Sequence, residues 1–227
     1  MRLLSLFDTT GYAVLPFTEC GWETIIVDTL NTGDRAVNPY ASKTLDWNIS
    51  EKEADLIALQ PDLILSFPPC TDLAVSGAAH FASKKQRNPA FQDEATYLAR
   101  TAERIGTACK VDWMAENPIS VLSTLWRKPN FIFDPFEFGG WLSAEDVHPD
   151  YPRYISPQDC YRKKTCWWTS SAFKLPRKKP VVCKLGYSKQ HKLLGGKSAK
   201  TKMIRSASPR GVFIALAERY TDNEDTP

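Results

Sequence analysis

The sequence predicts an α/β fold with a doubly wound, mostly parallel sheet. Three observations support this prediction. Short apolar runs alternate with helix-like segments over the first 120 residues, and the runs end at polar or reactive side chains. The length of 227 residues also suits one such domain with a small appendage.

Four apolar runs in this part of the chain have the character of buried strands. We expect these strands at residues 3–7, 24–28, 63–67 and 111–115. Helices are expected at residues 11–20, 51–59 and 90–109, where apolar side chains recur near helical spacing. Strands that alternate with helices form crossover units, and such units build a parallel sheet.

The pattern loosens after residue 130. We expect strands at 130–136 and 162–169, a loop insertion at 139–157, an irregular segment at 174–202 and a final helix at 211–220. The predicted organisation has three parts: a cofactor-binding and catalytic core (1–150), a basic, reduced substrate- or DNA-contacting region (151–205), and a C-terminal helix that returns to the core, followed by an acidic tail (206–227).

The net charge of +3 conceals a strong separation of charge along the chain. Residues 1–150 carry a balance of −9, residues 151–210 a balance of +15, and residues 211–227 a balance of −3. A basic block of this size, interleaved with aromatic residues such as Trp167 and Trp168, favours a polyanionic partner such as nucleic acid. The alternative is a solvated basic surface without a partner.

The six cysteines are scattered and form no CxxC pair. This pattern indicates neither a disulfide framework nor a zinc site, and we expect no bound metal. The apolar start of the chain turns acidic at Asp8 and lacks a cleavage pattern, so we interpret it as a strand rather than a signal peptide. No apolar run approaches the ~20 residues of a membrane span. We therefore expect a cytoplasmic protein without a membrane partner, and favour a monomer.

Polar or reactive residues follow each of the four predicted strands. These residues are Asp8, Asp28, Cys70 and Glu116. Ligands of such sheets bind outside the carboxyl ends of the strands, so we expect the four side chains at one rim. The alternative is that strand ends are polar because they lead into loops, which would explain one or two of the four residues. Two prolines precede Cys70 and leave its side chain little freedom of position.

A thiolate beside a carboxylic acid suits addition to an electron-poor pyrimidine ring. The thiolate is a strong nucleophile and adds to ring carbon 6, while the acid holds or protonates ring nitrogen 3. Negative charge then builds on carbon 5, which can accept an electrophilic methyl group.

On these residues the chain resembles the cytosine carbon-5 DNA methyltransferases, and especially their short bacteriophage forms. The resemblance lies in residues 6–11 (LFDTTG), Asp28, residues 67–70 (FPPC) and residues 116–118 (ENP). Two later segments, 161–168 (YRKKTCWW) and 205–211 (RSASPRG), are similar to the phage forms.

The resemblance implies the methyltransferase type of doubly wound sheet and transfer of a methyl group from S-adenosylmethionine to carbon 5 of cytosine in DNA, in the host cytoplasm if the protein is phage-encoded. It implies a covalent adduct of Cys70 with carbon 6. The implied catalytic residues are Cys70, Glu116 and Lys164. The implied cofactor-binding residues are Phe7, Asp8, Thr9, Thr10, Gly11, Asp28, Asp46 and Pro68. The implied substrate- or DNA-binding residues are Ser66, Asn117, Arg162, Arg205 and Arg210.

Three departures from the family pattern keep other functions open. Thr9 stands where the first loop of the family usually has Gly, and residues 205–211 replace a Gly-Asn motif. Only about thirty residues separate Thr169 from Lys202, where the larger enzymes carry a target-recognition domain. The substrate could therefore be duplex or single-stranded DNA, or a free or modified pyrimidine nucleotide. Besides methylation of DNA and methylation of a nucleotide, a third hypothesis is a non-catalytic nucleic-acid-binding protein on a methyltransferase scaffold.

Overall fold

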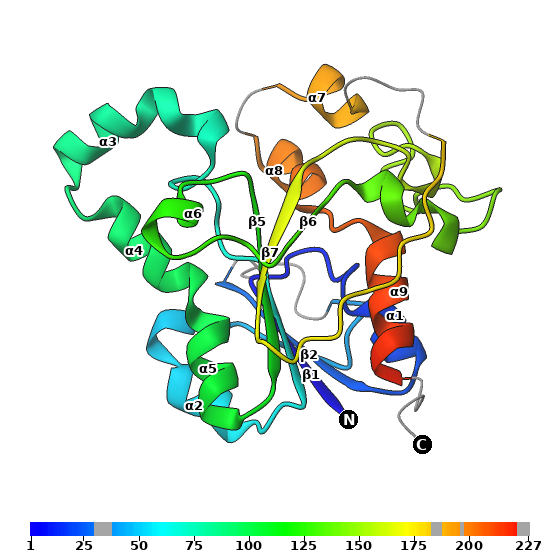
Figure 1. The fold of residues 1–227 in the computed structure, drawn as a ribbon, viewed down its shortest axis with the longest axis horizontal. Helices are drawn as coiled ribbons and strands as arrows, with labels where there is room; N and C mark the ends of the chain where they lie inside the picture. The colour runs from blue at the N-terminus through cyan, green and yellow to red at the C-terminus, as the bar shows by residue number, and fades with distance from the viewer. Residues whose placement is uncertain (30–37, 183–187, 196–197, 222–227) are drawn as a thin grey trace.

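The computed structural model describes residues 1–29, 38–182, 188–195 and 198–221. Within them, seven strands form one sheet in the order β3-β2-β1-β4-β5-β7-β6 (Figure 1). The strands are β1 (Arg2–Leu6), β2 (Glu23–Val27), β3 (Lys43–Leu45), β4 (Leu63–Ser66), β5 (Asp112–Pro118), β6 (Phe131–Phe133) and β7 (Thr165–Thr169).

The first five strands of the sheet order pair in parallel, and β7 runs antiparallel to both β5 and β6. Each parallel connection passes through a crossover, as the alternation of strands and helices predicted. The predicted fold class, an α/β fold with a doubly wound and mostly parallel sheet, is confirmed.

Helices cover both faces of the sheet. The α-helices are α1 (Leu15–Glu19), α2 (Glu53–Ala58), α3 (Phe81–Arg87), α4 (Phe91–Ala99), α5 (Thr101–Cys109), α6 (Leu122–Leu125), α7 (Lys189–Leu193), α8 (Ala199–Ser206) and α9 (Arg210–Thr221). The short 3-10 helices are η2 (Ile49–Glu51), η3 (Val75–His80), η4 (Pro135–Trp141) and η5 (Pro157–Asp159). None of the described helices is long and apolar enough to span a bilayer.

Alternate residues of the buried strands enter two separate cores. On one face, Leu3, Ile26 and Leu65 pack with Phe17 of α1 and Phe213 of α9. On the other face, the neighbouring strand residues pack with α2, α4 and α5. Side chains of a strand point alternately to opposite faces, so continuous apolar runs such as residues 63–65 serve both cores.

Several predicted elements differ in extent from the observed ones. The helix predicted at 90–109 is two helices, α4 and α5, which meet at Arg100. The helix predicted at 11–20 is the shorter α1, and the strand predicted at 130–136 is β6 followed by η4. The segment predicted as irregular, 174–202, contains α7 and the first half of α8, and the short strand β3 was not predicted.

The basic region 151–205 contributes an inner strand to the sheet, next to the edge strand β6. Its residues 165–169 form β7, which lies between β5 and β6 and is fully buried. This region therefore shares the core with residues 1–150 through β7, while the proposed division of roles among the three parts of the chain remains a prediction.

Candidate active site

The carboxyl ends of the central parallel strands meet at one edge of the sheet. In the register of the strands, Leu6 pairs with both Val27 and Ser66, and Ser66 pairs with Ala115. The residues that follow these pairs are Phe7, Asp28, Phe67 and Glu116, which therefore lie at one level of the sheet. This edge, with the loops that follow the four strands, is called the rim below.

The loop after β1 is held by the buried carboxylate of Asp8. Asp8 accepts hydrogen bonds from Ser5 Oγ (3.0 Å) and from the backbone N–H of Gly11 (2.8 Å). Burial raises the pKa of Asp8 to about 6, and the hydrogen bonds from Gly11 and Ser5 act in the opposite direction. The buried Asp8 carboxylate therefore holds the backbone of this loop at Gly11.

Gly11 occupies a position that a larger residue would not fit. Its φ of +75° lies in the left-handed region, and a Cβ atom here would overlap the side chain of Asn38. Phe7 also has a positive φ, of 56°, at the end of β1, and its backbone N–H donates to Val27 O at 2.8 Å. The loop after β1 thus turns sharply at Phe7 and Gly11, and the hydrogen bond to Val27 joins its start to β2.

Thr9, the departure from the family pattern, binds the acid at the end of β2. Thr9 Oγ1 donates a hydrogen bond to Asp28 Oδ2 at 2.8 Å. Asp28 is buried, and its backbone N–H donates to Leu45 O at 3.2 Å, which places the exposed Asp46 at the same rim. A threonine hydroxyl in this loop therefore links the first two strand ends.

Three short polar side chains at the rim are buried without a hydrogen-bond partner among the described residues. These are Thr10 Oγ1, in the first loop, Ser66 Oγ, in the last residue of β4, and Ser120 Oγ, in the loop after β5. A buried polar atom without a partner is unfavourable, so such atoms commonly mark the place of a water or a ligand. The first loop thus has a polar group available for a ligand.

The loop that carries Cys70 is tightly tied to the segment after β5. Cys70 itself is exposed, and its carbonyl oxygen accepts hydrogen bonds from the N–H groups of Leu73 (3.1 Å) and Ala74 (2.8 Å). Residues Ala74 and Ser120 form an antiparallel bridge. Lower in the loop, the buried Asn117 Nδ2 donates to Pro68 O at 3.3 Å.

Glu116 is close enough to Cys70 to affect the ionisation of its thiol. Desolvation by the surrounding protein, followed by the Glu116 carboxylate, raises the pKa of the Cys70 thiol, although the residue lies exposed at the rim. Burial likewise raises the pKa of Glu116. Lys163 acts in the opposite direction on the pKa of both groups. A thiol, a carboxyl group and an ammonium group thus share one electrostatic site.

Lys163 is a site residue that the sequence analysis missed in favour of its neighbour Lys164. Lys163 Nζ donates a hydrogen bond to Arg205 O at 3.0 Å. Lys164 Nζ instead pairs with Asp134 Oδ2 at 3.1 Å. The signal that would have identified Lys163 is the antiparallel direction of β7, which brings the start of that strand to the carboxyl ends of β4 and β5.

The three predicted DNA-binding arginines lie in different surroundings. Arg162 is exposed, with its guanidinium 5.9 Å from the ring centroid of Phe136. Arg205 is exposed and donates to Leu194 O at 2.8 Å. Arg210 is mostly buried and pairs with Asp146 Oδ2 at 2.6 Å. This ion pair holds the start of α9 to the insertion before β7, so the structure gives Arg210 a structural contact.

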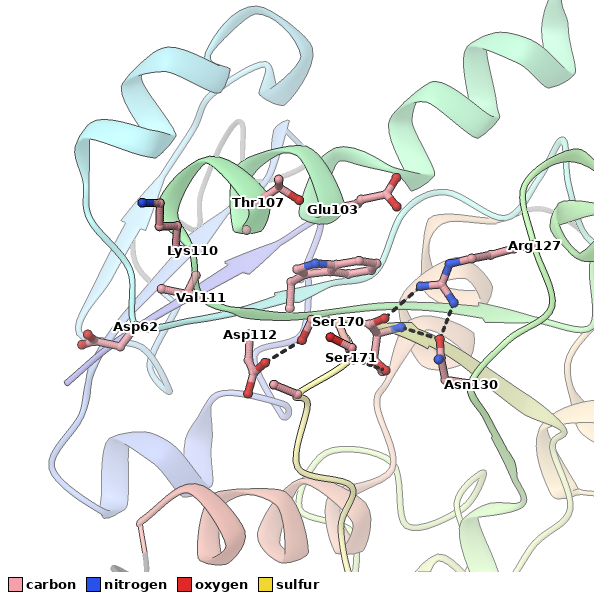
Figure 2. A pocket seen from close by; sticks show the side chains of 14 residues that line it. Asp62, Glu103, Thr107, Lys110, Val111, Asp112, Arg127, Asn130, Ser170 and Ser171 are labelled. Carbon is pink, nitrogen blue, oxygen red and sulfur yellow. Dashed lines mark hydrogen bonds between the residues drawn. The ribbon is translucent and has the colours of Figure 1, made fainter. Parts of the chain in front are cut away.

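A separate open groove lies at the other end of the strands (Figure 2). The groove has a volume of about 870 Å³ and is lined near the start of β5 by Asp112 and Trp113. Glu103, Lys110 and Arg127 give it charges of both signs. No predicted site residue lines this groove.

No protein-family model and no curated protein matches the sequence. Among solved structures, the chain is similar to a prophage-encoded protein of E. coli described as a DNA modification methyltransferase, with a TM-score of 0.46 and 14% identity, over 78% of this chain and 49% of that one.

A second solved structure is that of UDP-glucose 4-epimerase from Thermotoga maritima. The TM-score is 0.33 and the identity 18%, over 47% of this chain and 35% of the epimerase. The chain therefore spans about half of the first protein and a third of the second. Similarities of this size do not assign a function.

Proposed function

We propose that this chain transfers a methyl group from S-adenosylmethionine to carbon 5 of cytosine in DNA. The observation that supports the proposal is the electrostatic contact among Cys70, Glu116 and Lys163 at the rim. A nucleophile, an acid and a cation are the groups that addition to a pyrimidine ring requires. Strand ends of a doubly wound sheet are also where such folds bind their ligands.

The residues of the first loop fit the polar groups of the cofactor. Thr10 Oγ1 is buried without a partner among the described residues, and Asp28 stands at the end of β2, where a ribose-binding acid is expected. Bound S-adenosylmethionine would supply an electrophilic methyl group at the rim. The remaining members of the proposed cofactor-binding set are Phe7, Asp8, Thr9, Gly11, Asp46 and Pro68.

Cys70 acts as the nucleophile in the proposed reaction. Its thiolate would form a bond from Sγ to ring carbon 6, and the electron pair displaced from the ring would reach carbon 5. Carbon 5 would take the methyl group of S-adenosylmethionine, whose sulfonium would leave as the neutral thioether. Transfer of the carbon 5 proton to water would then break the bond to Sγ and return Cys70 as a thiolate. Lys163 favours this thiolate because a nearby cation stabilises the negative sulfur.

Glu116 acts as the acid on ring nitrogen 3. Its raised pKa favours the protonated carboxyl group, which can donate a hydrogen bond to that nitrogen. Two negative charges at the shared site oppose each other, so a protonated Glu116 is also the state in which Cys70 ionises most easily. Protonation of Glu116 thus removes one of the two influences that raise the pKa of Cys70, while desolvation remains.

The basic region contacts the phosphates of the proposed substrate. Arg162 and Arg205 are exposed on this region, and Lys163 of the same region acts on Cys70 and Glu116. Phosphate contacts position a nucleic acid without specifying its sequence. Ser66 and Asn117, buried under the nucleophile loop, are proposed to act on the substrate through the position of that loop.

A free pyrimidine nucleotide is the second candidate substrate. Between β7 and α9 the structure describes two short helices, of five and eight residues, which offer little surface for reading a base sequence. The chemistry at Cys70 and Glu116 would be the same with this substrate.

Mass spectrometry of nucleosides after incubation with S-adenosylmethionine tests the proposal. Duplex DNA, single-stranded DNA and dCMP are offered separately, and 5-methylcytosine is measured. The expected result is transfer to DNA that is lost in Cys70→Ala and retained in Cys20→Ala, because Cys20 is an exposed cysteine outside the rim. Undiminished transfer by Cys70→Ala would exclude the mechanism, and transfer to dCMP alone would establish the second candidate.

A further inference from the structure

Two large aliphatic side chains stand exposed beside the proposed active site. Val75 is 48% exposed and Ile119 is 46% exposed. Val75 lies five residues after Cys70, and Ile119 lies three residues after Glu116. The two side chains thus come from the two loops that carry the proposed nucleophile and acid.

The backbone fixes Val75 and Ile119 as a pair. Ala74 and Ser120 form an antiparallel bridge, with hydrogen bonds from Val75 N to Ile119 O (3.1 Å) and from Val121 N to Leu73 O (3.0 Å). In this register Val75 lies opposite Ile119, and residues opposite each other point to the same side of a ladder.

The other side of this short ladder faces the interior. Ala74 and Ser120 are each only 6% exposed, whereas Val75 and Ile119 project outward. Both outward side chains are β-branched and therefore stiff at χ1. The result is a small, rigid apolar projection at the edge of the site.

The surroundings of the pair are basic. The segment from Val75 to Arg87 carries three lysine or arginine residues and no acidic residue. Lys84 donates to Thr71 O at 2.9 Å and pairs with Asp72 Oδ1 at 2.6 Å, which fixes α3 to the nucleophile loop. Lys85 and Arg87 are exposed and leave a local excess of positive charge. In Figure 1, α3 and α6 lie on one side of β5, and α7 and α8 lie on the other. DNA presents negative phosphates on its outside and stacked bases on its inside. An apolar projection flanked by cations is complementary to both.

We infer that Val75 and Ile119 form an apolar wedge that enters a DNA duplex beside the target base. The inference rests on the proposed function and identifies duplex DNA as its substrate. Aliphatic side chains inserted between base steps are known to unstack and kink a duplex, with flanking cations on the phosphates. A target base must leave the duplex to reach Cys70. A wedge next to the site would hold apart the bases that remain stacked in the duplex.

Binding of DNA that contains 2-aminopurine tests the wedge. The probe is a duplex with 2-aminopurine next to several cytosines, and the same labelled strand alone serves as the single-stranded probe. Both are titrated with the full chain in the absence of cofactor. We expect wild-type protein to raise the fluorescence of the duplex, because unstacking relieves the quenching of 2-aminopurine.

The double variant Val75→Ala/Ile119→Ala should lose this fluorescence increase and bind the duplex about tenfold more weakly, with single-strand binding unchanged. Val147→Ala is the matched control, since Val147 is an exposed aliphatic residue outside the site, and Ile119→Leu should retain the wild-type signal. Equal losses on both forms of DNA, or full duplex binding by the double variant, would overturn the inference.

The outcome is separable from that of the proposed function. The fluorescence needs neither cofactor nor methyl transfer, so a wedge effect without methylation would refute the proposed function alone. Methylation of duplex DNA with no effect of the double variant on binding would refute the wedge alone.

Discussion

Asn117 Nδ2 donates a hydrogen bond to Pro68 O at 3.3 Å and so joins the two halves of the proposed active site. Pro68 lies two residues before Cys70, and Asn117 directly follows Glu116. Both partners are buried, which favours a persistent contact. This interior side-chain amide therefore helps to fix the nucleophile relative to the acid, together with the backbone bridge between Ala74 and Ser120.

Replacement of Asn117 by Ala should slow catalysis more than it destabilises the fold. Loss of the contact should lower kcat by about 10- to 100-fold, because a misplaced nucleophile reacts slowly, and should lower the free energy of unfolding by about 1–3 kcal/mol. Steady-state methyl transfer and urea unfolding measure the two effects.

Asn130→Ala provides the matched control for Asn117→Ala. Asn130 Oδ1 accepts from Thr169 N at 3.0 Å near the groove at the other end of the strands. This variant should lose stability and keep kcat. An equal fall of kcat in both variants would contradict a positioning role for Asn117.

The alkylation rate of Cys70 should report its two charged neighbours. Because the pKa of Cys70 is raised, its reaction with iodoacetamide should be slow near neutral pH and accelerate as the pH rises past the ordinary thiol range. Glu116→Gln removes a negative neighbour and should accelerate the reaction several-fold at pH 8. Lys163→Met removes the cation and should slow it.

Mass spectrometry of the Cys70 peptide measures these rates, with the exposed Cys20 in the same protein as an internal reference. Lys164→Met is the control for Lys163→Met, since Lys164 pairs with Asp134. A larger change in the alkylation rate for Lys164→Met than for Lys163→Met would show that Lys164 is the cation that acts on Cys70.

Gly11→Ala should impair cofactor binding far more than Gly21→Ala. Both glycines have a left-handed φ, of +75° and +81°, so each alanine variant carries a backbone strain of about 1 kcal/mol. Only at Gly11 would the new Cβ atom also overlap a neighbour, the Asn38 side chain. Calorimetry with S-adenosylmethionine should show at least tenfold weaker binding for Gly11→Ala alone, and similar losses for both variants would argue against a cofactor-binding first loop.

Asp8→Asn should change how stability depends on pH between pH 4 and 6. Asp8 ionises near pH 3.8 when unfolded and near pH 6 when folded, so the unfolded state releases its proton first. The wild type should therefore lose stability relative to Asp8→Asn as the pH rises through this window, by on the order of 3 kcal/mol, and the difference should be constant above it.

Urea unfolding of both proteins at several pH values measures this difference. The buried Asp159, whose pKa is also raised to about 6, is common to both and cancels. Parallel pH profiles would mean that Asp8 is not the group that binds the extra proton.

The sequence was sufficient to predict four of the five parallel strands. Residues 3–4, 25–27 and 63–65 are apolar on both faces, which is the pattern of strands covered by helices on both sides, and these strands are observed. The short, half-exposed β3 has no such run, so local pattern gave no sign of it. Which strands become neighbours depends on contacts between distant residues, which periodicity does not reveal.

The contacts of the later charged residues were also beyond local pattern. Arg210 pairs with Asp146, which is 64 positions away, and Lys164 pairs with Asp134, which is 30 positions away. From the sequence each cation was equally available for DNA. Only the tertiary structure distinguishes Lys163, near Cys70 and Glu116, from cations already paired with acids.

The reversed direction of β7 has a consequence for how this site is built. A parallel strand presents its last residue at the rim, whereas β7 presents its first, so the chain enters the sheet there with Lys163 just ahead of Thr165. The cation is thereby carried on a segment that leads into the sheet, while the thiol and the acid are carried on segments that lead out. Changes in the length or charge of that incoming segment can retune the electrostatics at the sulfur without moving either of the strands that hold the reacting groups.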